Sequence, residues 1–482
     1  MTPEVDLGPV LPELLLVAVG IAGLLYEAFA RRSDVRIHLT LALFAVAVAA
    51  VAAASLWGRE GPAFVLGDTV AADRFSVLAT AILLAAAFVG CLYYAAEAGR
   101  DPSLYRGEFF PLVLFATSGM VLIAAANDLI LVFLALEILS LSLYVLTGIT
   151  GRRQASEASL KYFLLGAFSS AFFLYGVAMA YGATASTKVT AIANALTGTG
   201  DELALALVAV AFLAIGFGFK VSAVPFHMWT PDVYQGAPTP VTAYMSAATK
   251  VAAFFALIRV FDVAFQPLWW DWTVLVVALA ALSVVVGSVL AIAQSDVKRM
   301  LAFSSVAHAG FVLTGLTAAD AAGIRSAMFY LVAYAIMTLG AFGVVMLVEA
   351  GREGRTTLRD FAGLGTRRPW LAALMTVFLL SLAGIPPTVG FIAKVTVFSA
   401  AIGAGHWPLA LLGVLTSVVA AFFYLRVIVY MYMRQPEGDP VEATVPGAPL
   451  VTAGVLAALT LVLGVFPSLL AGILEEASIL RW

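Results

Sequence analysis

Charged side chains are scarce in this sequence. Asp, Glu, Lys and Arg make up 11% of the 482 residues, whereas soluble domains contain about 25%. The formal net charge of −3 gives no basis for nucleic-acid binding. Cysteine is limited to Cys91, so the chain can form no internal disulfide and cannot supply the four thiolates of an iron–sulfur cluster. No glycine-rich phosphate loop follows a strand pattern, and we expect neither a cofactor nor a metal in this chain.

Apolar side chains dominate instead. They make up 62% of the residues, and windows of about 20 apolar residues, enough to cross a bilayer core of about 30 Å, recur along the whole chain. The first run, Leu14 to Phe29, follows the acidic start "MTPEVDLG" without a basic leader or a small-residue cleavage site, so we interpret it as a retained helix. The sequence therefore predicts an all-α, polytopic membrane protein in which residues 1–482 form one transmembrane domain.

The apolar windows divide into fourteen expected membrane spans. These are residues 9–29, 37–57, 74–96, 109–126, 128–148, 158–181, 203–235, 240–261, 272–294, 300–317, 324–348, 370–403, 408–432 and 450–472. Fifteen of the 26 Lys and Arg residues lie in the odd-numbered joints between spans, and five lie on the other side. Because short cytoplasmic loops carry the excess of basic residues, and because the number of spans is even, this bias predicts that both termini lie on the outer face of a bacterial plasma membrane.

Two of the spans are too long for one straight helix. Residues 203–235 and 370–403 would each extend about 50 Å as a helix. Prolines inside them, Pro225 and Pro231 in the first and Pro386 and Pro387 in the second, remove backbone donors and predict a break in each. The breaks fall in the seventh and twelfth spans, which cross in opposite senses. We therefore expect two inverted five-helix repeats, spans 4–8 (109–261) and 9–13 (272–432), with spans 1–3 (1–108) and span 14 (450–472) outside them.

Ionisable residues inside the spans are the candidates for function. Glu137 lies near the middle of the fifth span, nine residues after Asp128, and a charge at the membrane centre costs about 2.5 to 3.5 kcal/mol on insertion scales. Burial lowers the proton affinity of a lysine and a nearby carboxylate raises it, so one acid and several lysines are suited to a proton relay. The sequence provides four lysines within spans: Lys161, Lys220, Lys250 and Lys394.

Each candidate also has a structural explanation. Lys161 follows soon after the start of its helix and could extend its ammonium to the interface. The mid-span acid and a lysine could form an ion pair that only fixes helix packing. His227 and His308 can carry a proton near neutral pH, but each could equally be a helix-packing residue. Arg259 and Arg426 lie near span ends, where we expect snorkelling or a structural role.

Three stretches of the sequence resemble a known family. "KVSAVPFHMWTPDVYQGAPTPVTAYMS", Lys220 to Ser246, resembles the signature of the antiporter-like proton-pumping subunits shared by respiratory complex I and multisubunit sodium/proton antiporters. "FLLSLAGIPPTVGFIAKVTVF", Phe378 to Phe398, and "LPELLLVAVGIAGLLYE" near the start are most similar to subunit N of NADH-quinone oxidoreductase. The resemblance covers nearly the whole chain, and spans 4 to 13 are its most informative part.

The resemblance implies a role for each candidate. Glu137 and Lys220 match a charge pair thought to set the proton affinity of a half-channel, and Lys161 matches the lysine of the sixth span. Lys250 and His308 match a central polar axis, and Lys394 matches the lysine of the broken twelfth span, on the outward exit side. His227 matches the second residue of the family's "FH" pair.

The expected function is proton translocation as a subunit of NADH-quinone oxidoreductase. The resemblance implies that NADH, FMN, iron–sulfur clusters and quinone are bound by partner subunits, and that the partners include the other membrane subunits of complex I, among them two further antiporter-like subunits, together with the lipid bilayer. The sequence leaves two alternatives open: a subunit of a multisubunit cation/proton antiporter, and a membrane scaffold in which the buried lysines only support packing.

Overall fold

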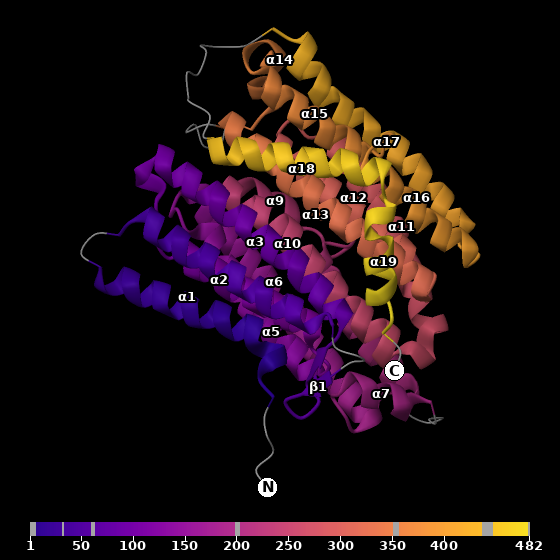
Figure 1. Cartoon of the computed structure of the whole chain (residues 1–482). Helices are drawn as coiled ribbons and strands as arrows, with labels where there is room; N and C mark the ends of the chain where they lie inside the picture. The colour runs from indigo at the N-terminus through magenta and orange to yellow at the C-terminus, as the bar shows by residue number, and fades with distance from the viewer. Residues whose placement is uncertain are drawn as a thin grey trace.

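The structure is a bundle of long, mostly parallel and antiparallel helices. It is a computed structural model that describes residues 6–30, 33–58, 63–197, 203–349, 356–435 and 447–480. Figure 1 shows the first half of the chain packed on one side of the bundle and the second half on the other. Six basic residues used in the topology prediction lie outside the described residues: Arg31, Arg32, Arg59, Arg352, Arg355 and Arg481.

The N-terminal part forms three long helices and a small hairpin. The helices are α1 (Leu11–Phe29), which follows a short turn of 3-10 helix (Gly8–Val10), α2 (Val35–Leu56) and α3 (Arg74–Arg100). Asp73 begins α3 because its side chain accepts a hydrogen bond from the Ser76 backbone N–H at 2.8 Å, as an N-cap does. The hairpin before it pairs β1 (Ala63–Val65) with β2 (Val70–Ala72) antiparallel, and the hydropathy pattern gave no sign of it.

Two further sets of helices follow along the chain. The first set is α4 (Phe109–Ala125), α5 (Leu129–Gly148), α6 (Arg153–Thr184), α7 (Val189–Leu196), α8 (Leu203–Val221), α9 (Trp229–Gly236) and α10 (Thr239–Arg259). The second set is α11 (Trp269–Ile292), α12 (Val297–Leu316), α13 (Ala321–Glu349), α14 (Leu364–Arg367), α15 (Pro369–Ala383), α16 (Val389–Gly403) and α17 (Trp407–Met433). The chain ends with α18 (Gly447–Val465) and α19 (Ser468–Ala477).

Twelve helices of the described residues are long and apolar enough to cross a membrane. Three shorter apolar helices, Phe109–Ala125, Pro369–Ala383 and Val389–Gly403, accompany them. The short helix α7 was not predicted. The expected last span, 450–472, is wrong as one helix, because the chain leaves the helix after Val465 and Pro467 precedes the start of α19.

The two long spans are interrupted as their prolines indicate. Between Val221, the last residue of α8, and Trp229, the first residue of α9, the chain is not helical and contains Pro225. Between Ala383 and Val389 it contains Pro386 and Pro387. Each interruption leaves the last carbonyls of the preceding helix without helical partners.

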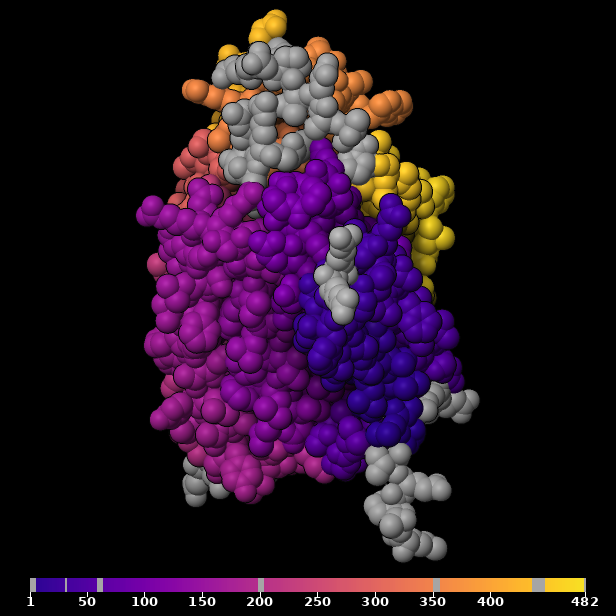
Figure 2. Space-filling view, turned by 90° about the vertical axis from the view of Figure 1, so that its left-hand side faces the viewer, coloured from indigo at the N-terminus to yellow at the C-terminus, as the bar shows by residue number. Residues whose placement is uncertain are grey.

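The interior of the bundle is formed by helices from both halves. The apolar window of α10 is 100% buried and that of α12 is 94% buried, whereas those of α2, α6 and α17 are 33% buried. Most of the face in Figure 2 belongs to the first half of the chain, coloured indigo to magenta, with part of the second half visible at its top and right edge. The broken helix α8–α9 and the buried helices α10 and α12 therefore lie where a membrane protein can hold polar groups away from lipid.

Candidate functional site: a buried polar axis

Lys220 lies in the last turn of α8 and is 3% exposed. Its Nζ donates a hydrogen bond to Ser140 Oγ of α5 at 2.7 Å. Three aromatic rings surround the same ammonium, those of Tyr144 and Tyr162 with centroids at 5.7 Å and that of Phe219 at 5.5 Å. A cation is attracted to the face of an aromatic ring within about 6 Å, so one hydroxyl and three rings form the immediate surroundings of Lys220.

Glu137 lies on α5, half-buried, one turn before Ser140. Ser170 Oγ of α6 donates a hydrogen bond to Glu137 Oε1. No ion pair of 4.0 Å or less joins Glu137 to Lys220 in the described part of the chain, so the two members of the charge pair that the resemblance implies are not in direct contact. Glu137 and Ser140 lie one turn apart on α5, so the carboxylate is on the same helix as the hydroxyl that accepts from the Lys220 ammonium.

Lys250 lies on α10 and is 2% exposed. Its Nζ donates to the carbonyl of Val221 at 2.7 Å and to that of Ser305 at 3.0 Å. Val221 is the last residue of α8, so its carbonyl is available only because the helix stops there. The C-terminal end of a helix carries partial negative charge, and the break therefore presents a negative helix end to a buried lysine.

Lys394 lies on α16, is 5% exposed and repeats this arrangement. Its Nζ donates to the carbonyl of Ala383, the last residue of α15, at 2.9 Å. The ring of Phe311 lies beneath the ammonium, with its centroid at 4.8 Å. Gly384 follows Ala383 with φ of +85°, and a Cβ there would lie 2.8 Å from Cδ of Lys394. At the second break, too, a helix end faces a buried lysine, and the residue that follows this helix end must be glycine.

His308 occupies the middle of α12 between the two lysines and is 2% exposed. Its Nδ1 shares a hydrogen bond with the hydroxyl of Tyr330 at 2.7 Å, and its Nε2 shares one with that of Tyr424 at 3.2 Å. Phe311, which lies beneath Lys394, is three residues further along α12, with its ring centroid 5.7 Å from that of His308. His308 therefore has a hydroxyl on each ring nitrogen and an aromatic ring between it and Lys394.

Ser305 connects His308 to Lys250. Its carbonyl accepts from Lys250, and its Oγ accepts from the hydroxyl of Tyr334 at 2.8 Å. Ser305 and His308 are three residues apart and share one face of α12. Lys220, Lys250, His308 and Lys394 consequently form one series through α8, α10, α12 and α16, which we call the polar axis.

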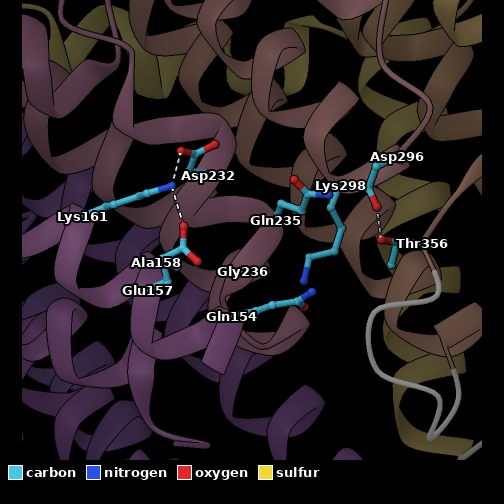
Figure 3. Close-up of a pocket in the computed structure, with 10 residues that line it drawn as sticks. All are labelled: Gln154, Glu157, Ala158, Lys161, Asp232, Gln235, Gly236, Asp296, Lys298 and Thr356. Atoms are coloured by element: carbon cyan, nitrogen blue, oxygen red, sulfur yellow. Dashed lines mark hydrogen bonds and ion pairs between the residues drawn. The ribbon is translucent and has the colours of Figure 1, made fainter. Parts of the chain in front are cut away.

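Lys161 lies apart from the polar axis. Its side chain is 44% exposed and its Nζ pairs with Glu157 at 2.8 Å and with Asp232 at 2.9 Å. Asp232 also accepts from Arg299 Nη1 at 2.6 Å. Figure 3 shows Lys161 between its two carboxylates at a cavity of about 220 Å³. The expectation that Lys161 is a relay group within the span is therefore not supported by its position, which agrees with the interfacial explanation.

The cavity of Figure 3 is lined from α6, α9 and α12 by polar side chains. Lys298, which is 3% exposed, donates its Nζ to the carbonyl of Ala237 at 2.7 Å. Asp296 Oδ2 accepts from Thr356 Oγ1 at 2.5 Å on the same side. This cavity lies at the ends of the helices, away from the groups of the polar axis.

His227 lies in the break between α8 and α9, half-buried, and its neighbours Pro225 and Met228 are exposed. Its Nδ1 has no hydrogen-bond partner among the residues that the structure describes. Its ring centroid lies 6.5 Å from that of Phe303. The structure therefore brings Lys220, Lys250, His308 and Lys394 together, but it places His227 and Lys161 at the periphery.

The two arginines expected near span ends have structural contacts. Arg259 is 1% exposed and binds Asp73 through both nitrogens, Nη1 to Oδ2 at 2.7 Å and Nη2 to Oδ1 at 2.9 Å. Snorkelling is thus wrong for Arg259, which joins the end of α10 to the start of α3. Arg426 donates to the carbonyls of Ile292 and Gln294 at the end of α11, as a structural role predicts.

The hydroxyl groups of the polar axis were not identified from the sequence. They belong to Ser140, Ser170, Ser305, Tyr330, Tyr334 and Tyr424. Serine and tyrosine are common in membrane helices, and a neutral hydroxyl gives no hydropathy signal of the kind that a lysine gives. Only their position on the helix faces that meet Lys220, Lys250 and His308 distinguishes these residues from the other serines and tyrosines of the chain.

Comparison with known proteins gives one consistent result. Residues 126–420 match the family described as NADH:quinone oxidoreductase/Mrp antiporter, TM. The chain is 44% identical to NADH-quinone oxidoreductase subunit N of Rhodococcus opacus, over 99% of this chain and 96% of that protein. It is 43% identical to the protein of the same name from Mycobacterium tuberculosis, over 99% of this chain and 98% of that protein.

Solved structures show the same similarity. A chain of respiratory complex I from Thermus thermophilus, determined with bound aureothin, superposes with a TM-score of 0.83 at 36% identity, covering 97% of this chain and 100% of that one. A chain of the Mrp complex from Dietzia superposes with a TM-score of 0.85 over 98% of this chain and 97% of that one, but at 22% identity it is similar in fold alone.

Proposed function

Because this chain belongs to the NADH:quinone oxidoreductase/Mrp antiporter family, and within it to the subunit N group, we propose that it is the proton-translocating subunit N of an NADH-quinone oxidoreductase. NADH oxidation and quinone reduction then take place in partner subunits, which hold NADH, FMN, iron–sulfur clusters and quinone. This chain uses the energy of that reaction to move protons, and the other antiporter-like subunits are its neighbours in a bacterial plasma membrane.

One observation carries the proposal: four titratable groups of the polar axis are buried inside the bundle. Lys220, Lys250, His308 and Lys394 are all at most 5% exposed and come from four helices of both halves. Buried titratable groups are costly in a membrane and mark ion or proton pathways. A scaffold role would need only apolar packing at these positions, so the series favours proton transfer.

The surroundings of each group are suited to gaining and losing a proton. Lys220 is held by a neutral hydroxyl and three rings, and Lys250 and Lys394 are held by carbonyls, so none of them is bound directly to a carboxylate. A direct carboxylate would fix a lysine in its charged form. Glu137, one turn from the Ser140 contact, supplies a weaker and adjustable attraction. In this proposal His308 passes protons between Lys250 and Lys394.

The broader architecture that we propose is fourteen spans in two inverted repeats. The twelve long helices, together with α4 and with α15–α16 taken as one broken span, account for fourteen crossings. Both termini lie on the outer face in this arrangement. Single cysteines placed at His406 and at Asp360, in a chain with Cys91 replaced, should be labelled from opposite sides of the membrane.

An Mrp-type cation/proton antiporter subunit is the second candidate function. The similarity to the Dietzia chain supports it in fold, but the relatives that cover nearly the whole chain at 43–44% identity are named NADH-quinone oxidoreductase subunit N. Purification of the tagged chain in mild detergent separates the two proposals. Flavin and iron–sulfur signals in the purified complex support the oxidoreductase, and small membrane subunits without flavin support the antiporter.

A further inference from the structure

A second hollow, of about 660 Å³, opens between α13, α16 and α19, and none of the four polar-axis residues lines it. Its outer rim carries Asp320, just before α13, Arg325 in the second turn of α13, and Glu475 of α19. Its wall carries Phe329 and Val395. Charged groups therefore lie at the rim of the hollow, and Phe329 and Val395 lie deeper, beside the hydroxyl groups of Ser326, Thr396 and Ser399.

The depth of this hollow follows the direction of the membrane helices. α13 begins at Ala321 and α16 ends at Gly403, so these two ends lie at the same level. Phe329 is one turn deeper than Arg325, and Val395 is eight residues before the end of α16, or about 12 Å at 1.5 Å per residue. The hollow thus passes from the helix ends, where lipid head groups lie, into the region of acyl chains.

α19 closes the hollow from outside without filling it. It packs on the bundle through Leu474 and Ala477, which are buried, whereas Leu469 and Ile473 are 59% and 41% exposed. Figure 1 shows α19 turned away from the direction of α18 and lying along the side of the bundle. Val395 on α16 is 43% exposed. α19 lines the hollow with Ala471, Leu474 and Glu475, whereas Leu469 and Ile473 lie outside it, so Val395 is the exposed large apolar side chain of the wall.

The charges at the rim are not satisfied by one another. No ion pair of 4.0 Å or less joins Arg325 to Asp320 or Glu475 in the described residues. Asp320 accepts a hydrogen bond from the backbone N–H of Gly323 at 2.7 Å, which leaves its second oxygen available. One cation and two carboxylates therefore face the same opening. A ligand that matches them needs an anionic group and a cationic group close together, followed by an apolar chain.

We propose that this hollow binds a phospholipid with a zwitterionic, primary-amine head group, of the phosphatidylethanolamine type. The phosphate pairs with the Arg325 guanidinium, which is suited to bidentate contacts with phosphate oxygens. The ammonium donates to Asp320 and Glu475, and one acyl chain lies against Phe329 and Val395. A lipid with a quaternary ammonium cannot donate these hydrogen bonds, and a lipid with only negative charge leaves the carboxylates unmatched.

The test uses a photoreactive lipid on the intact, purified membrane complex. Phosphatidylethanolamine with a diazirine in its acyl chain is added to the complex in detergent–lipid micelles, irradiated, and the labelled peptides are identified by mass spectrometry. We expect labelling of the peptides that contain Phe329 and Val395. Arg325→Gln should reduce it at least about tenfold, since hydrogen bonds to charged groups contribute about 1.5 to 3 kcal/mol. Arg325→Lys should retain a large part of the labelling.

Controls separate a specific site from general lipid contact. Lys188→Gln removes a cation that pairs with Asp68 far from this hollow and should leave labelling unchanged, and the matching phosphatidylcholine probe should label several-fold less. Equal labelling by both probes, or equal labelling of the wild type and Arg325→Gln in normally assembled complexes, would overturn the proposal. Protein–protein crosslinks from the same peptides in place of lipid adducts would also overturn it, by showing a partner subunit in the hollow. The outcome is independent of proton pumping.

Discussion

Replacing Lys220 by arginine separates proton transfer from charge alone. The arginine can keep the main contacts of the lysine, because Ser140 Oγ and the rings of Tyr144, Tyr162 and Phe219 also accept a guanidinium. We therefore expect Lys220→Arg to assemble at near-normal levels. Lys220→Met removes the cation of the proposed charge pair with Glu137.

The expected loss of function follows from the chemistry of the two cations. The reference pKa of an arginine side chain lies about 2 to 3.5 units above that of a lysine side chain. In the same surroundings, arginine costs about 3 to 5 kcal/mol more to deprotonate, which lowers its deprotonated fraction by a factor of about 10² to 10³. A relay that passes through this residue should therefore almost stop in Lys220→Arg, and Lys220→Met should also pump poorly.

The assay is proton uptake by inside-out membrane vesicles during NADH oxidation, followed with a pH-sensitive dye and expressed per electron transferred. Lys298→Arg is the matched control, because Lys298 is also 3% exposed and also donates to a neutral acceptor, the carbonyl of Ala237. Lys298 lies outside the polar axis, so the proton-to-electron ratio of Lys298→Arg should stay near the wild-type value. A normal proton-to-electron ratio in assembled Lys220→Arg would refute the assignment of Lys220 to the relay.

Four further changes test other parts of the structure. Glu137→Gln keeps an acceptor for Ser170 but removes the charge, so the complex should assemble and pump less per electron; an unchanged ratio in the same vesicle assay would count against the Glu137 role. Lys161→Arg should pump normally, since a guanidinium can serve both carboxylates at this exposed site, and a strong loss would return Lys161 to the relay. Gly384→Ala should lower the free energy of unfolding by about 1 to 2 kcal/mol, because Gly384 has a left-handed φ. The added Cβ should also displace Lys394 and so weaken pumping. An unchanged melting temperature would contradict the geometry. Arg259→Met should destabilise the chain by about 3 to 5 kcal/mol by leaving Asp73 buried and unpaired, and Arg259→Met combined with Asp73→Leu should melt at a higher temperature than the single variant.

The sequence predicts the helices and the breaks because these depend on simple physical signals. Hydropathy over about 20 residues detects a span whatever its neighbours are, and a proline interrupts a helix locally. Lysines inside apolar runs are equally visible, which is why Lys220, Lys250 and Lys394 could be proposed from the sequence. The distortion at Pro467 was missed because the apolar pattern continues into α19 beyond the proline.

The contacts between helices could not be predicted in the same way. Hydropathy gives the depth of a residue along a span but not the direction of its side chain around the helix. Glu137 and Lys220 could therefore be named as a charge pair without the group that touches the lysine, and the structure shows that this group is the Ser140 hydroxyl. Lys161 was counted among the lysines within spans because the expected span begins at residue 158. In the structure α6 begins earlier, at Arg153, and this first turn brings Glu157 to the Lys161 ammonium. Arg259 pairs with Asp73, a buried residue that lies 186 residues away in sequence. No local sequence pattern indicates this pairing.

The two helix ends that face Lys250 and Lys394 have a consequence for how this protein can vary. The acceptors there are the main-chain carbonyls of Val221 and Ala383, which every amino acid possesses. No side-chain substitution at those two positions can delete the acceptor. Scanning mutagenesis of Val221 and Ala383 will therefore not reveal that their carbonyls hold the lysines. What specifies the acceptor is the position at which each helix stops, and only a shift of that stop by one residue would rotate a different carbonyl into its place, by about 100° around the helix. Insertions and deletions near the prolines should therefore be far less tolerated than exchanges of the residues themselves.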